Sequence, residues 1–171
     1  MKIWIIRILL LAVILWWMYT IYDFSGDTGE QSQSLSDKIT IKVVHIIEKN
    51  YDSMAPKEQK ELFEHTSFYV RKIGHFGEFA ILAILISFFV MTFEKMKMNR
   101  KLLWIIPSVV CFLYALSDEI HQGFVDGRTP KVLDVGVDTV GGLCGALFML
   151  ILFVIFAKRR EKHLLIQPSK N

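Results

Sequence analysis

Pairs of a carboxylate and an imidazole at helical spacing are the residues of this sequence best suited to chemistry. His75 and Glu78 are three positions apart, and so are Asp118 and His121. Residues three or four apart share one face of a helix, so each pair would lie side by side. Burial and neighbouring charge can bring such groups to titrate near neutral pH, which is the requirement for general acid–base catalysis. The catalytic candidates are His75, Glu78, Asp118, Glu119, His121 and Gln122.

A second set of charged residues flanks these candidates and is suited to binding. Arg128 has the planar guanidinium that binds a phosphate or carboxylate through two hydrogen bonds. The substrate-binding candidates are Arg71, Lys72, Arg128, Asp134 and Asp138. One-turn histidine–carboxylate pairs also bind metals in helical bundles and also occur as ordinary hydrogen-bonded neighbours. The metal and any cofactor therefore stay unassigned.

Four apolar segments must position these residues. Hydrophobic residues make up 53% of the 171-residue chain and charged residues 22%, so charge has to be segregated from long apolar runs. The runs cover residues 3–22, 73–93, 102–120 and 132–157. Each is long enough to cross a hydrocarbon layer of about 30 Å. We expect an all-α integral membrane bundle of four transmembrane helices, forming one domain over residues 1–171. A cleaved signal peptide is the alternative for the first run, although no small-x-small site follows it.

Basic residues predict the orientation of this bundle. They gather at the beginning of the first run, between the second and third runs, and after the fourth, at Lys2, Arg7, Lys95, Lys97, Arg100, Lys101, Lys158, Arg159, Arg160 and Lys162. Because short basic segments stay in the cytoplasm, both termini are expected there, in the bacterial cytoplasmic membrane. Residues 23–72 are then extracytoplasmic. In that segment Leu35, Ile39, Val43 and Ile46 predict an amphipathic surface helix, and Pro56 predicts the beginning of a second helix.

This topology brings the three charged stretches to the outer ends of the last three spans. Ionisable groups in a membrane span are costly, so they usually point inward and often mark function. The alternative is structural: Arg128 or Arg71 would neutralise Asp118, Asp134 and Asp138 and fix the helices without chemistry. Both cysteines are interpreted as small buried apolar residues.

The same residues resemble a known family, the VanZ-like membrane proteins. The resemblance rests on Phe24-Ser25, Arg71-Lys72 through Glu78-Phe79, Ser117 through Gln122, Gly127-Arg128, and Asp134 to Asp138 with Gly141-Gly142. Phe79 departs from the tyrosine expected there, so no mechanism should need a hydroxyl at that position. The resemblance implies a small bacterial membrane protein, in a family whose founding member is linked to resistance to the glycopeptide teicoplanin.

Three kinds of function are compatible with this sequence. The first is an enzyme acting on an envelope lipid or wall precursor, although the sequence has no nucleophile elbow, P-loop or zincin motif. The second is a binding protein for an anionic headgroup or antibiotic. A transporter ranks last, because the carboxylates lie near one surface and four spans leave little room for alternating access. A net charge of +3 does not indicate nucleic-acid binding, so membrane lipids are the expected partners.

Overall fold

The computed structural model describes residues 2–26, 29–125 and 129–166, and within these ranges the regular structure is entirely helical. Four helices are long and apolar enough to cross a membrane: α1 (Lys2–Gly26), α3 (Pro56–Met91), α5 (Arg100–Gln122) and α6 (Val132–Ile166). They correspond to the four predicted runs. The predicted all-α class with four candidate spans is therefore confirmed.

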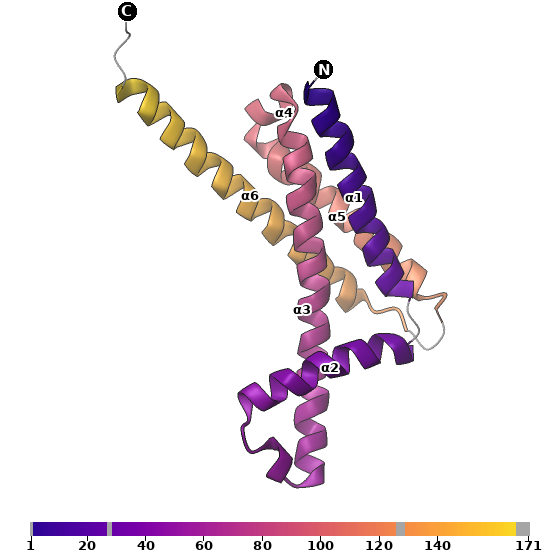
Figure 1. Ribbon diagram of the computed structural model, residues 1–171. Helices are drawn as coiled ribbons and strands as arrows, with labels where there is room; N and C mark the ends of the chain where they lie inside the picture. Colours follow the sequence, from indigo (N-terminus) through magenta and orange to yellow (C-terminus); the bar gives the residue numbers. More distant parts are fainter. Residues whose placement is uncertain (1, 27–28, 126–128, 167–171) are drawn as a thin grey trace, which may run out of the picture.

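The helices run alternately up and down the bundle (Figure 1). The beginning of α1 and the end of α6 lie at one end, together with the short helix α4 (Glu94–Met98). The helix α2 (Gly29–Ile47) and the 3-10 turn η1 (Tyr51–Ser53) lie at the other. The basic residues therefore share one end of the molecule: Lys2, Lys95 and those at the end of α6. An even number of membrane crossings requires this arrangement.

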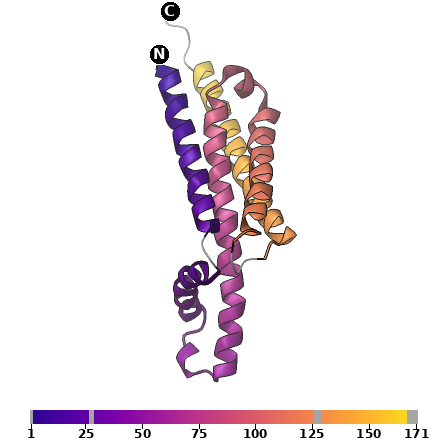
Figure 2. The same cartoon turned by 90° about the vertical axis from the view of Figure 1, so that its right-hand side faces the viewer.

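The helix α3 is much longer than a membrane crossing needs. Its 36 residues span about 54 Å at about 1.5 Å per residue, against about 30 Å of hydrocarbon. It begins at Pro56, which occupies the first turn as predicted. The helix expected from Pro56 and the second span are one continuous helix, whose first part extends beyond the other spans (Figure 2).

The amphipathic helix begins earlier than its apolar pattern indicated. We expected helical periodicity from Leu35 after a Ser/Gly-rich linker, but α2 starts at Gly29. The residues that precede Leu35 are polar, and polar residues other than glycine and proline are compatible with a helix. Hydrophobic periodicity marks only the part of a helix that meets an apolar environment, and therefore missed its polar beginning.

Two glycines allow α3 and α6 to touch backbone to backbone. A Cβ on Gly141 would lie within 3.0 Å of the backbone of Phe76, and one on Gly145 within 3.0 Å of the backbone of Ala80. Small residues four apart permit this close approach in membrane bundles. The core beside this contact is apolar and includes Phe79, Leu82, Ala83, Ile86, Leu103, Cys111, Ala115 and Ala146.

The two cysteines are both free, and only one is buried. Cys111 of α5 is buried against Gly142 of α6. A Cβ added at Gly142 would lie 2.5 Å from the Cys111 Cβ. Cys144 is exposed, so its predicted burial was wrong. It falls on the side of α6 that faces away from the helix contact, which an apolar run alone does not distinguish from the packed side.

Polar contacts fasten α1 to the bundle. Among its described residues only Ile14, Ile21 and Ser25 are buried. The Tyr114 hydroxyl donates a 2.6 Å hydrogen bond to the Met18 carbonyl of α1. Because lipid is as apolar as most of the α1 surface, hydrogen bonds of this kind contribute to holding the span in place.

Arg7 fastens the other end of α1. Its guanidinium donates to the Thr92 hydroxyl at 3.1 Å and to the Thr92 carbonyl at 2.9 Å, where α3 ends. It also lies 3.9 Å from the centre of the Phe93 ring. Arg7, the one charged residue in the first apolar run, thus binds Thr92 at the end of α3.

Candidate functional site

Asp118 accepts hydrogen bonds from Ser25 and Gln122, among the described residues, where α1 and α5 meet. The Ser25 hydroxyl donates to Asp118 Oδ2 at 2.8 Å, and Gln122 Nε2 donates to the same oxygen at 2.9 Å. Gln122 Nε2 also lies 3.2 Å from the Ser25 oxygen. Asp118 is 3% exposed, Ser25 3% and Gln122 5%, so this group is buried. Asp118 and Gln122 lie one turn apart on α5, which is why both reach Ser25.

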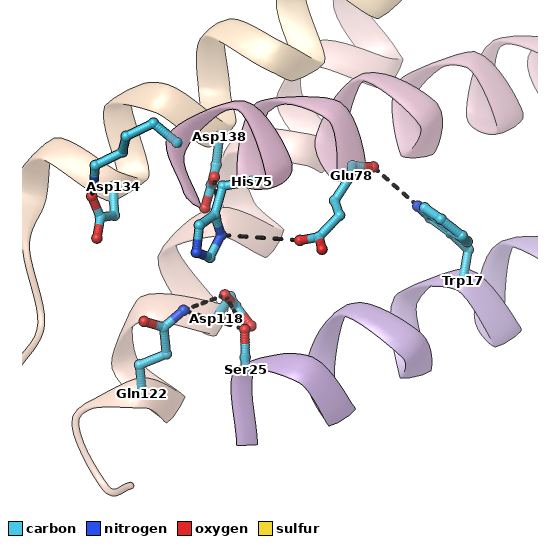
Figure 3. A network of polar contacts seen from close by, with 9 residues as sticks. Trp17, Ser25, His75, Glu78, Asp118, Gln122, Asp134 and Asp138 are labelled. Atoms are coloured by element: carbon cyan, nitrogen blue, oxygen red, sulfur yellow. Dashed lines mark hydrogen bonds and ion pairs between the residues drawn. The ribbon is translucent and has the colours of Figure 1, made fainter. Parts of the chain in front are cut away.

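His75 lies between two carboxylates of different helices. Its Nδ1 atom is 3.7 Å from Asp138 Oδ1 on α6 and 4.0 Å from Glu78 Oε2 on α3. Asp138 is 1% exposed, whereas the His75 and Glu78 side chains keep 22% and 26% of their surface. Figure 3 shows His75 and Glu78 on α3 facing the side where Ser25, Asp118 and Gln122 lie.

The backbone contact at Gly141 explains how Asp138 reaches His75. Gly141 lies one turn after Asp138 on α6, and Phe76, the residue that it meets, follows His75 on α3. The close approach of the two backbones therefore sets the distance between the imidazole and the buried carboxylate. The resulting cluster has two partly exposed side chains, His75 and Glu78, and one buried carboxylate, Asp138.

Two of the predicted substrate-binding residues pair with one another. Lys72 Nζ on α3 forms an ion pair with Asp134 Oδ1 on α6, and each side chain keeps 16% of its surface. This pair joins the two helices at the beginning of α6. Its charges neutralise each other, so the geometry assigns Lys72 and Asp134 a fastening contact.

Two predicted catalytic residues also have structural contacts. A Glu119 carboxylate oxygen accepts a hydrogen bond from the backbone N–H of Lys131, just before α6 begins. Negative charge at this point is favourable for the free N–H groups of a helix beginning. The His121 ring stacks on Tyr22 of α1, with ring centres 4.1 Å apart and planes inclined by 23°. These contacts tie α5 to α6 and to α1.

The predicted arginines differ in what the structure describes of them. Arg71 is exposed, one position before Lys72 on α3. Arg128 lies outside the described residues, in the segment 126–128. Anion binding by Arg128 therefore stays a prediction.

Sequence reasoning missed two residues that complete the site. Ser25 was used only to support the family resemblance, yet its hydroxyl contacts Asp118. Trp17 donates its indole N–H to the Glu78 carbonyl at 3.0 Å and fixes α1 beside this part of α3. The position of Ser25 at the end of an apolar span could have pointed to it. Trp17 lies within such a span and could not be distinguished from a lipid-facing residue.

Metal ligation receives no geometric support in the described ranges. Within them, no group of three or more His, Cys, Asp and Glu side chains could hold a metal ion. The arrangement can instead move a proton: an imidazole faces two carboxylates, one buried and one partly open. Hydrogen bonds in such sites often tighten only when substrate binds, so distances of 3.7 and 4.0 Å are compatible with acid–base exchange.

Comparison with known proteins identifies the family. Neither the curated proteins nor the solved structures give a match to this chain. The sequence does match the VanZ/LLP1 family over residues 9–155, which includes all four candidate spans in whole or large part and every residue of the site. The chain is therefore a multi-pass membrane protein that belongs to the VanZ/LLP1 family.

Proposed function

We propose that this protein acts in the bacterial cell envelope and contributes to tolerance of teicoplanin-type glycopeptides through the polar site at the ends of its spans. The substrate would be an envelope lipid or a cell-wall precursor. One observation carries the proposal: His75 Nδ1 lies 3.7 Å from buried Asp138 and 4.0 Å from partly open Glu78. Ionisable groups within membrane spans are retained mainly where they serve such a function.

In the proposed mechanism, Glu78 is the base that faces the substrate. Its side chain is partly exposed, so a substrate hydroxyl or a water can approach it. His75 would take up or return the proton, and Asp138 would stabilise the imidazolium that forms. Asp118, held by Ser25 and Gln122, would orient a polar group of the substrate.

The orientation that this function requires places the site outside. Basic residues at the end of the molecule opposite the site favour a cytoplasmic location for that end. Single cysteines at Asn99 and Asn50 test this by labelling intact cells with a membrane-impermeant reagent. Asn50 should label and Asn99 should be protected; labelling of Asn99 alone would overturn the outward-facing site.

The alternative is a binding protein without turnover, in which the charged groups mainly fasten the helices. The Lys72–Asp134 ion pair favours this reading for its own two residues. The two readings differ in what neutralising a carboxylate does. A buried ion pair that loses one partner destabilises a protein by about 3–5 kcal/mol, because the other charge stays buried.

The test is a comparison of Glu78→Gln and Asp118→Asn with Asp134→Asn. Teicoplanin tolerance, protein abundance in membranes and the midpoint of thermal unfolding would be measured for each. We expect the first two variants to lose tolerance at normal abundance, since both amides keep the shape of the acid. Asp134→Asn should lose abundance and stability because Lys72 loses its partner.

Two outcomes would contradict the proposal. If tolerance falls only in proportion to abundance in Glu78→Gln and Asp118→Asn, their carboxylates are structural. If both variants are abundant and fully protective, neither carboxylate takes part in the function. Arg128→Gln serves as a further variant for anion binding, with loss of tolerance at normal abundance expected.

A further inference from the structure

The helix α2 is attached to the rest of the protein by one of its faces. Ser36, Thr40 and Val44 recur every four residues and are 8%, 0% and 0% exposed. The helix packs mainly against α3, whose first half has Thr66 and Ser67 as its buried residues. Figures 1 and 2 show α2 crossing this half of α3 at a steep angle. The buried face of α2 is therefore its contact with α3.

An exposed apolar flank lies beside this buried face. Ile39 is 55% exposed and Ile46 is 78% exposed. At about 100° per residue, both lie about a quarter turn from the buried face. Lys42 lies next to them on the outer side, and Lys38 lies about 40° farther round the helix. Both lysines are exposed. An apolar stripe bordered by lysines is the pattern of a helix that lies in a membrane interface.

The direction of α2 decides which way this flank faces. In Figure 1 the helix runs from right to left, and Figure 2 shows it at the side of α3 that faces the viewer in Figure 1. Because an α-helix is right-handed, the flank with Ile39 and Ile46 then faces the membrane-spanning part of the bundle. Ile41 is on the opposite flank and faces away from it.

The position of α2 along α3 matches the headgroup layer. Thr66 precedes Ile73, which is 68% exposed at the beginning of the apolar segment, by seven residues, or about 10 Å of helix. The headgroups add about 5–7 Å to each side of the hydrocarbon, and a helix has a radius of about 5 Å. The isoleucine flank thus reaches the headgroup layer.

Aromatic residues support the same level. Tyr69 is 51% exposed and Phe68 is 44% exposed on the turn of α3 next to the crossing. Tyrosine is enriched where the hydrocarbon meets the headgroups. The exposed aromatic side chains therefore mark this part of α3 as the level of the headgroups.

We propose that α2 is a membrane-surface helix that docks on anionic lipid headgroups of the leaflet next to the polar site. Ile39 and Ile46 enter the boundary between headgroups and acyl chains. Lys38 and Lys42 contact the lipid phosphates, to which a basic surface is electrostatically attracted. This inference concerns lipid contact alone and does not depend on the proposed function.

The first experiment locates the two flanks relative to the bilayer. Full-length protein with Cys111→Ala and Cys144→Ala is reconstituted into vesicles of phosphatidylcholine and phosphatidylglycerol. A fluorophore is attached at Ile39→Cys or, as the matched control, at Ile41→Cys, which replaces a residue that is 46% exposed. Lipids with brominated chains should quench the label at position 39 several-fold more than the label at 41. Equal quenching, or protection of position 39 from water without quenching by lipid, would overturn the proposal; the latter would indicate a protein partner.

The second experiment tests the lysines by charge. Lys38→Gln/Lys42→Gln is compared with Lys57→Gln/Lys60→Gln, since Lys57 and Lys60 keep 87% and 76% of their side-chain surface at the beginning of α3. Preference for phosphatidylglycerol over phosphatidylcholine at the protein boundary is measured with spin-labelled lipids. In Lys38→Gln/Lys42→Gln the preference for phosphatidylglycerol should fall about tenfold, and in the control pair it should hardly change. Equal loss in both pairs, or no loss in either, would contradict contact of Lys38 and Lys42 with anionic lipid.

Discussion

Gly141→Ala should loosen the contact that sets the geometry of the site. The added methyl would overlap the carbonyl oxygen of Phe76 and would lie 3.0 Å from its carbonyl carbon and Cα, whereas ordinary contact begins at 3.4 Å. The obstacle is backbone rather than a flexible side chain, so α3 and α6 must separate by roughly 1 Å or more to restore ordinary contact. The distance of 3.7 Å between His75 Nδ1 and Asp138 Oδ1 should grow by a similar amount.

The energetic effect follows from two opposing terms. Adding a methyl to a tight contact costs about 1–3 kcal/mol. Replacing glycine by alanine inside a helix returns about 1 kcal/mol. The difference is about 0–2 kcal/mol of the free energy of unfolding. Because the obstacle is backbone, we expect a loss near the upper end of this range, which lowers the unfolding midpoint measurably.

Gly136→Ala is the matched control on the same helix. Nothing lies within 4 Å of a Cβ at Gly136, so only the gain in helix propensity remains. Thermal unfolding in detergent and teicoplanin tolerance would be measured for both variants. Gly141→Ala should be less stable and less protective, and Gly136→Ala at least as stable as the unchanged protein. Equal stability of the two variants would refute a tight contact at Gly141.

Three further results are expected. Ser25→Ala should cost about 1 kcal/mol of stability in thermal unfolding, because Asp118 loses the hydrogen bond that Ser25 donates; an unchanged midpoint would show that the bond contributes nothing. Arg7→Gln should speed amide hydrogen exchange at the end of α3 about tenfold, since two hydrogen bonds there are lost. A nuclear magnetic resonance titration should find the pKa of His45 raised above its ordinary 6.5, first by its hydrogen bond to the Ile41 carbonyl and then by Asp52. The stabilising contact between His45 and Asp52 should then be complete below pH 6.5 and be lost as pH rises through the raised pKa, whereas Asp52→Asn should lower that pKa.

The sequence predicted the spans because the membrane imposes a length and a composition on each crossing. Runs of about 20 apolar residues have few other interpretations, so all four were found. Pro56 also marked a helix beginning correctly, since proline fits the first turn. The beginning of α2 and the exposure of Cys144 were mistaken, because neither polarity at a helix beginning nor the packed side of an apolar helix is visible in composition.

Residues of the site were predictable where helical spacing brings them together. His75 and Glu78 share a face of α3, and Asp118 and Gln122 share one of α5, as their spacing indicated. Contacts between helices were not predictable in this way. Lys72 pairs with Asp134, and His75 lies 3.7 Å from Asp138. His121 stacks on Tyr22. The rotation of each helix and the distance between backbones decide such pairs.

The site also fastens the span that closes it. Most of α1 faces lipid, so apolar burial does little to hold this helix against the others. Hydrogen bonds from Ser25 to Asp118 and from Trp17 to the Glu78 carbonyl lie at the same end of α1. A substrate group that displaced Ser25 from Asp118 would remove one of these bonds and release the end of α1. Under the proposed function, access to the site and docking of α1 would therefore be coupled, and Asp118 would serve both the chemistry and the fold.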